Sequence, residues 1–351
     1  MVAGMALSHR LWMGARNYPT APVWDGLPAV AGPLDAVIFA VLLGLLVWIG
    51  VSARPGWGIA AFVVGMAGYC LFDQGRWQPW VYQYLVMLGV VGVSYVWPGA
   101  EGLNTCRLVC ACIYFWSGVH KAQAGFVPEF RWLTGPVSEA LPGWVSFTIP
   151  AMEVAIAVSL VSRSLRRTAV VAAVAMHVLI LASIGPLGRG WNAVVWPWNV
   201  AMATMVALLF WRERGPLWRA KAYWRLVIPL FLIAPLASFA GLWDSYPSFA
   251  LYSGDNADGT IYLSRAVTER LPEAVQDEVI ENDSGVDELD VSDWSFAELQ
   301  VPAYPEARVF RSVAKGVCRM VGSPGDMLLI IEEKRSWVGR RRLATYGCGA
   351  L

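Results

Sequence analysis

Long apolar runs separated by short polar loops dominate the chain up to about residue 245. A helix rises about 1.5 Å per residue, so about 20 apolar residues cross the hydrocarbon core of a bilayer. The pattern therefore predicts a polytopic α-helical membrane protein with about eight spans, the second of which is short. The predicted spans are residues 30–51, 58–72, 80–98, 104–120, 146–162, 168–186, 193–211 and 226–243.

The pattern changes after the last run. Of 26 acidic residues, only nine precede residue 252, and such a shift marks a domain boundary. Alternating residues predict strands at 249–253 and 259–264, and helical spacing predicts a helix over 305–320. We therefore expect a small C-terminal α+β domain. The predicted divisions are an outer N-terminal segment (1–28, the end of a truncated first helix), a transmembrane domain (29–245) and this domain (246–351).

Composition and charge agree with a membrane protein. The chain is 57% hydrophobic and 15% charged, with 19 Trp and a net charge of +1, which leaves no basic surplus for nucleic acid and makes membrane lipid the expected neighbour. The loops richest in Lys and Arg, 162–167 and 211–225, are expected on the cytoplasmic side. The protein is then a multi-pass plasma-membrane protein whose C-terminal domain is extracytoplasmic.

Four of the six cysteines fall in predicted spans, and Cys318 and Cys348 fall in the outer domain. The outer pair forms a disulfide if the compartment is oxidising and the geometry allows it, or consists of two unpaired residues. The cysteines within the spans lack the partners of a metal site, so no metal is expected.

Ionisable residues within spans are costly and need an explanation. Lys121 with the adjacent His120, Glu153 and His177 fall near the outer ends of three successive spans. One interpretation is an outward-facing pocket in which Lys121 acts as a base supported by the other three. The other is an interfacial anchor at Lys121 and a hydrogen bond between helices at Glu153 and His177.

The segment "FDQGRWQPWVYQYL" (72–85) combines charged and aromatic residues at the same predicted boundary. Asp73 and Arg76 are candidates for an ion pair. Trp77 and Tyr82 either belong to an interfacial aromatic belt or form part of a lid that contacts a ligand in the pocket.

The segment "GPLGRGWNAVVWPWN" (185–199) has similar character. Gly and Pro interrupt the helix, and irregular backbone at this depth is tolerated where it is buried or lines a cavity. Asn192 and Asn199 offer polar contacts there. Trp116, in the aromatic run 114–116, is a further candidate ligand contact.

The segment "YFWSGVHKAQAGF" (114–126) resembles the part of the vitamin K-dependent γ-carboxylase superfamily that carries its catalytic lysine. That superfamily includes the bacterial HTTM-domain proteins, and "DQGRWQPWVYQYL" and "AMHVLILASIGP" look like further elements of that type. The likeness spans about residues 20–250. It implies that Lys121 is the base that deprotonates a reduced quinone, that His177 matches a functional histidine, and that Glu153 occupies an acidic position of the next helix.

The chain also departs from that superfamily in three respects. His120 stands where the carboxylase has a second Lys, "AQAGF" lacks the acidic residues found there, and the C-terminal domain is small. We expect a pocket for a quinone-like or lipidic molecule, with carboxylase-like chemistry using Lys121 as one possibility. The alternative is a non-catalytic membrane scaffold whose outer domain engages a protein partner. A transporter ranks third, because no paired broken helices are seen.

Overall fold

The computed structural model describes residues 1–351 apart from 29, 31, 98–100, 136–140, 218–226, 323–326 and 336–340. Internal contacts divide the chain into two compact units, which we describe separately. The bundle unit comprises residues 1–4, 45–63 and 79–255, and the sheet unit comprises residues 5–44, 64–78 and 256–351. The domain boundaries at residues 28 and 245 stay a prediction.

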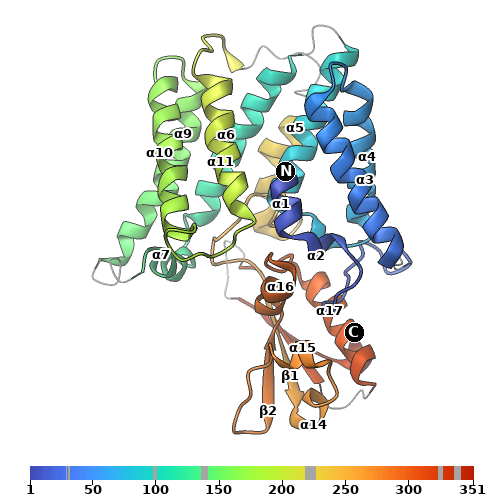
Figure 1. Cartoon of the computed structure of the whole chain (residues 1–351). Coiled ribbons are helices and arrows are strands. Elements are labelled where there is room, and N and C mark those ends of the chain that lie inside the picture. The colour runs from blue at the N-terminus through green and yellow to red at the C-terminus, as the bar shows by residue number, and fades with distance from the viewer. Residues whose placement is uncertain are drawn as a thin grey trace. The chain divides into compact units, whose positions relative to one another are not determined.

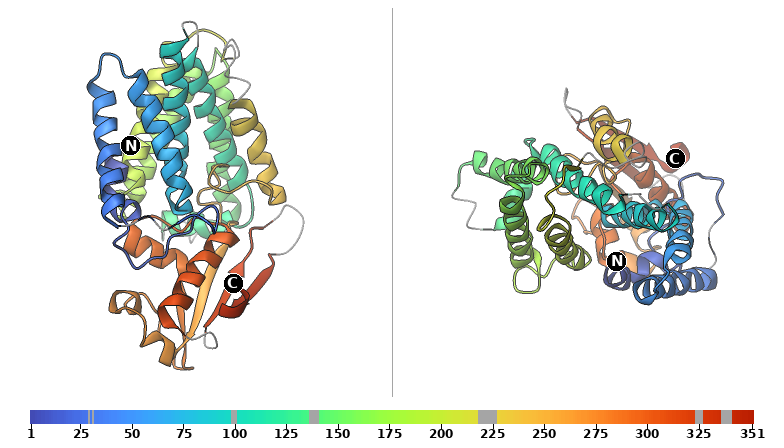
Figure 2. Two further views of the ribbon diagram at one scale, coloured as in Figure 1. Left: turned by 90° about the vertical axis from the view of Figure 1, so that its right-hand side faces the viewer. Right: turned by 90° about the horizontal axis from the view of Figure 1, so that it is seen from above.

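The bundle unit is helical (Figures 1 and 2). Its central helix, α6, contacts α5, α9 and α11, and most of its side chains are buried. The helices are α5 (Pro79–Val96), α6 (Gly102–Lys121), α7 (Phe126–Thr134), η2 (Gly143–Phe147), α9 (Thr148–Val161), α10 (Arg166–Ile184), α11 (Val195–Phe210), the π-helical η4 (Ile228–Ile233), α13 (Ala234–Ala237) and η5 (Ser238–Ala240). The short α1 (Val2–Leu7) begins in this unit.

Four helices among the described residues are long and apolar enough to cross a membrane. They are Gly32–Val51, Pro79–Val96, Gly143–Val161 and Arg166–Ile184, and shorter apolar helices occupy Gly56–Leu71, Val195–Phe210 and Ile228–Ala240. The predicted count of eight spans is therefore not confirmed. The largest difference is α6, which is helical where a span is predicted but carries Arg107, His120 and Lys121. A helix packed within a bundle need not be apolar all round.

The sheet unit contains α2 (His9–Trp12), the first part of α3 (Gly32–Val51), the last part of α4 (Gly56–Leu71) and η1 (Gln74–Arg76). Its C-terminal part holds a four-stranded antiparallel sheet in the order β2-β1-β3-β4. The strands are β1 (Asp258–Ser264), β2 (Val286–Asp290), β3 (Met327–Glu332) and β4 (Leu343–Gly347). The helices are α14 (Arg265–Thr268), α15 (Glu273–Gln276), α16 (Val291–Leu299) and α17 (Ala307–Val321), followed by η6 (Cys348–Ala350).

Alternating burial along the strands creates the core of this domain. Ile261 and Leu263 of β1 and Leu329 and Ile331 of β3 are fully buried. The helix α16 packs against β1 and β2, and α17 packs against β1 and β3. The helix predicted over 305–320 is confirmed as α17, whose apolar side chains recur at helical spacing and bury one face.

Two further expectations are resolved in the sheet unit and the adjoining segment. Residues 249–253 form turns instead of a strand, because Phe249 and Tyr252 have left-handed backbone conformations with φ of 59° and 53°. β1 instead pairs with β2 and β3. Cys318 and Cys348 form a disulfide, the first of the two alternatives left open by the sequence.

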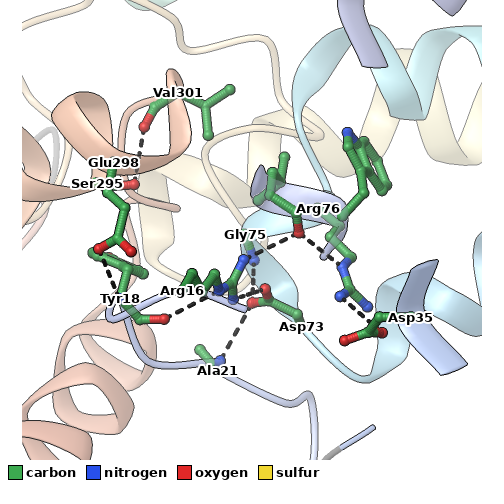
Figure 3. A network of polar contacts seen from close by, with 12 residues as sticks. Arg16, Tyr18, Ala21, Asp35, Asp73, Gly75, Arg76, Ser295, Glu298 and Val301 are labelled. Atoms are coloured by element: carbon green, nitrogen blue, oxygen red, sulfur yellow. Dashed lines mark hydrogen bonds and ion pairs between the residues drawn. The ribbon is translucent and has the colours of Figure 1, made fainter. Parts of the chain in front are cut away.

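Two buried ion pairs join the region around η1 to the N-terminal segment and to α3 (Figure 3). The guanidinium of Arg16 pairs with Asp73, and that of Arg76 lies 3.5 Å from the carboxylate of Asp35. The predicted pairing of Asp73 with Arg76 is therefore wrong. Asp73 instead caps η1 by accepting from the Gly75 amide, which turns its second oxygen toward Arg16.

Candidate functional site

The bundle unit contains a cavity of about 350 Å³. A pocket of this size, with mostly apolar walls and a few converging polar groups, has the character of a small-molecule site. Its polar lining includes Tyr114, Ser117, Lys121, Glu153, His177 and Asn199. Apolar residues of α6, α7, α9, α10 and α11, among them Ile113, Phe126, Met152, Met176, Ile180, Val195 and Met202, complete the wall.

The cavity contains a buried ion pair between α6 and α9. The Lys121 ammonium donates to both carboxylate oxygens of Glu153, at 2.8 and 3.0 Å, and to the Ser117 hydroxyl at 2.6 Å. The two charged side chains are 10% and 6% exposed. Ser117 lies one turn before Lys121 on the same helix face, so the lysine head is held from both its own helix and the next.

Gly118 explains why α6 and α9 approach closely enough for this contact. A Cβ at position 118 would lie 2.7 Å from the Pro150 carbonyl oxygen, 2.8 Å from Val154 and 3.1 Å from the Glu153 Cβ. Small residues permit such backbone approach between membrane helices. The small residue Gly118 therefore allows Lys121 of α6 to reach the Glu153 carboxylate of α9.

A second polar group on the cavity wall connects three helices. His177 of α10 contacts the Tyr114 hydroxyl of α6 through Nε2 at 2.7 Å and the Asn199 side-chain oxygen of α11 through Nδ1 at 2.8 Å. Asn199 donates its amide nitrogen to the Val195 carbonyl, so its oxygen faces the imidazole. Nδ1 must then carry a proton, and in the neutral imidazole Nε2 accepts the Tyr114 O–H.

Three of the four predicted catalytic residues line the same cavity: Lys121, Glu153 and His177. His120 does not line it, although it precedes Lys121 in sequence. Its ring stacks on Phe239 with centroids 4.3 Å apart. Successive residues of a helix are about 100° apart around its axis, so adjacent positions face different neighbours.

The four residues predicted to contact a ligand do not line the cavity. Tyr82 stacks on Phe231, and Trp116 packs against Phe239. Asn192 reaches the cavity indirectly, since its amide donates to the hydroxyl of the lining residue Tyr252. Trp77 belongs to the sheet unit.

Asn192 and the cavity-lining residue Tyr252 form a hydrogen-bonded pair beside the cavity. Both have left-handed backbone conformations, with φ of 50° and 53°. Asn tolerates this region, whereas an aromatic residue there is uncommon and stores strain. The hydrogen bond between the two side chains holds the Tyr252 ring at the wall.

Tyr114 and Ser117 are site residues that the sequence interpretation did not identify as such. Together with Lys121 they occupy positions i, i+3 and i+7 of α6, which is the spacing of a single helix face. The helical spacing of the polar residues in "YFWSGVHK" is therefore the sequence signal that could have identified them.

Among the described residues, no group of three or more His, Cys, Asp or Glu side chains has the arrangement of a metal site. Cys106, Cys110 and Cys112 are free and buried in α6. They contribute to the hydrophobic core of the bundle.

Residues 99–195 match the family model described as methylamine utilisation protein MauE. The match contains α6, α9 and α10, and with them Lys121, Glu153 and His177, but it covers less than a third of the chain. The identification of an HTTM or γ-carboxylase-like protein is therefore wrong. A short run of aromatic and small residues before an interfacial lysine is too common in membrane helices to distinguish families. Comparisons with curated proteins and with solved structures find no match.

Proposed function

We propose that the protein binds a largely apolar small molecule with a polar head, of quinone-like or lipidic character, in the cavity of the bundle unit. The observation that carries this proposal is the convergence of two polar groups on one apolar cavity. Lys121 with Glu153 supplies a charged donor and acceptor, and Tyr114 with His177 supplies a neutral pair. An apolar body would occupy the rest of the volume.

The ion pair supports recognition of an oxygen-bearing head group. The Lys121 side chain lines the cavity, and its three donors are directed to the Ser117 hydroxyl and the two Glu153 oxygens, so a ligand oxygen would replace one of these acceptors. A ligand carbonyl or hydroxyl there would accept from the ammonium while Glu153 balances its charge. We propose Lys121 and Glu153 as the polar anchor, with the Tyr114–His177 pair as a second contact.

The location and orientation belong to the proposal as well. We place the C-terminal domain outside the cytoplasm. The disulfide between Cys318 and Cys348 supports this arrangement, because disulfides persist in oxidising compartments and are rare in the cytosol.

The experiment is mass spectrometry of lipid extracts and of the native protein, purified in mild detergent. The variant Lys121→Met/Glu153→Met removes both charges together. The matched control is Arg107→Met/Glu213→Gln, which removes a pair with a 3.0 Å separation that does not line this cavity.

We expect an apolar molecule of quinone or isoprenoid mass to accompany the wild type and the control. Its occupancy should fall at least about tenfold in the cavity variant, which corresponds to about 1.4 kcal/mol. Equal occupancy in both variants contradicts the polar anchor. A wild type that carries no such molecule, and takes up none from added ubiquinone, contradicts the proposal and favours the non-catalytic scaffold.

A further inference from the structure

The sheet unit contains a groove of about 410 Å³ between α17, the N-terminal segment and the start of α3. Three arginines from different parts of the chain, Arg16, Arg76 and Arg319, line it. The remaining lining residues are Gly14, Asn17, Tyr18, Pro19, Thr20, Val30, Asp35, Phe72, Gly316 and Met320.

The two acidic side chains beside the groove are already compensated (Figure 3). Asp73 pairs with Arg16, and Asp35 pairs with Arg76 and accepts from the Tyr69 hydroxyl at 2.7 Å. Arg16 also donates to the backbone oxygens of the N-terminal segment. These contacts hold Arg16 and Arg76 in place, and each of the two carboxylates has a positively charged partner.

Arg319, the third arginine that lines the groove, pairs with neither of these carboxylates. It lies in the last turn of α17 and is exposed. No ion pair or hydrogen bond joins its guanidinium to another described residue. The same face of α17 carries Arg308, Arg311 and Lys315, spaced by three or four residues, so the groove lies at the end of a basic stripe.

The groove lies where an apolar span begins. Asp35 is in the first turn of α3, and Phe72 follows the last residue of α4. From this point Leu34, Val37 and Val41 of α3 are 53–58% exposed, at positions i, i+3 and i+7 of a single face. Such a face is suited to acyl chains.

We propose that this groove binds the head group of an anionic phospholipid whose acyl chains lie along the exposed face of α3. The guanidinium of Arg319 would pair with the phosphate. The basic stripe of α17 would favour a lipid with net negative charge over a zwitterionic one. Trp24, 70% exposed in the loop before α3, fits an interfacial position beside the head group.

Native mass spectrometry of the full-length, delipidated protein tests the proposal, with phosphatidylglycerol and phosphatidylcholine of identical chains as probes. We compare Arg319→Gln with Arg311→Gln, an equal loss of charge at an exposed position of the same helix outside the groove. The variant Arg319→Lys keeps the positive charge but lacks the planar guanidinium, which can donate two parallel hydrogen bonds to a phosphate.

One arginine near an anionic lipid surface contributes about 1 kcal/mol. Arg319→Gln is therefore expected to weaken phosphatidylglycerol binding about fivefold, Arg311→Gln less than about twofold, and Arg319→Lys by an intermediate amount. Phosphatidylcholine should bind the wild type more weakly than phosphatidylglycerol. Equal effects of the two glutamine variants indicate general electrostatic attraction and contradict the site, as does equal binding of the two lipids.

Discussion

Removing one partner of the Lys121–Glu153 pair should destabilise the protein far more than removing both. At a separation of 2.8 Å, two unit charges attract by about 6 kcal/mol at an effective dielectric constant of about 20. Burial of the two ions opposes this attraction by several kcal/mol for each. Lys121→Met leaves Glu153 buried without its countercharge, so we expect the free energy of unfolding to fall by about 3–5 kcal/mol. Lys121→Met/Glu153→Met should lie within about 1 kcal/mol of the wild type.

Unfolding by SDS of the detergent-solubilised protein, followed by tryptophan fluorescence, measures these differences. The pair Lys315 and Asp25 provides the control, because its side chains are 41% and 75% exposed. Loss of Lys315 alone should lower stability by no more than about 1 kcal/mol. If Lys121→Met is as mild as this control, or if the double variant is no more stable than the single one, the pair is not the coupled, buried contact that we describe.

Three further predictions concern other parts of the chain. Gly118→Ala places a methyl group 2.7 Å from the Pro150 carbonyl oxygen, so it should force α6 and α9 apart and lower the free energy of unfolding by about 1–3 kcal/mol in the same assay. Burial raises the pKa of Asp290 from 3.8 to about 6. The contribution of this residue to the free energy of unfolding is therefore greatest below pH 4 and is lost as the pH rises through 6. Asp290→Asn, which keeps a helix-capping side chain, should therefore stabilise the protein by about 1–2 kcal/mol at pH 8 and have little effect at pH 3, measured as the difference in melting temperature. Reduction of the disulfide between Cys318 and Cys348, 30 residues apart, should destabilise the C-terminal domain by about 3–4 kcal/mol, seen as faster proteolysis of the full chain after dithiothreitol.

The sequence predicted the elements whose pattern is local. Apolar runs located the long helices of the bundle, because a span must be apolar over its whole length. The spacing in "PEARVFRSVAKGVCRM" located α17 for a similar reason, since one face packs on the sheet and the other meets water. The turn at 249–253 was missed, because alternating apolar residues look the same in a strand and in an irregular segment with left-handed residues.

The sequence could not predict which partners meet across the fold. Asp73 and Arg76 are close in sequence, yet each pairs with a residue of the N-terminal segment or α3. His120 and Lys121 are adjacent, yet only Lys121 faces the cavity. The choice depends on the rotation of each helix and on the docking of distant segments, and a single sequence contains neither.

The cost of burying charge is the strongest physical argument that the cavity is more than a packing defect. Apolar side chains of similar size at positions 121 and 153 would hold α6 and α9 together about as well as the ion pair does. The pair also does not set the approach of the helices, which Gly118 already permits. Both charges line an otherwise largely apolar cavity beside the ordered Tyr114–His177 contact. Packing alone does not require this combination, whereas recognition of a polar head on an apolar molecule requires both parts of it.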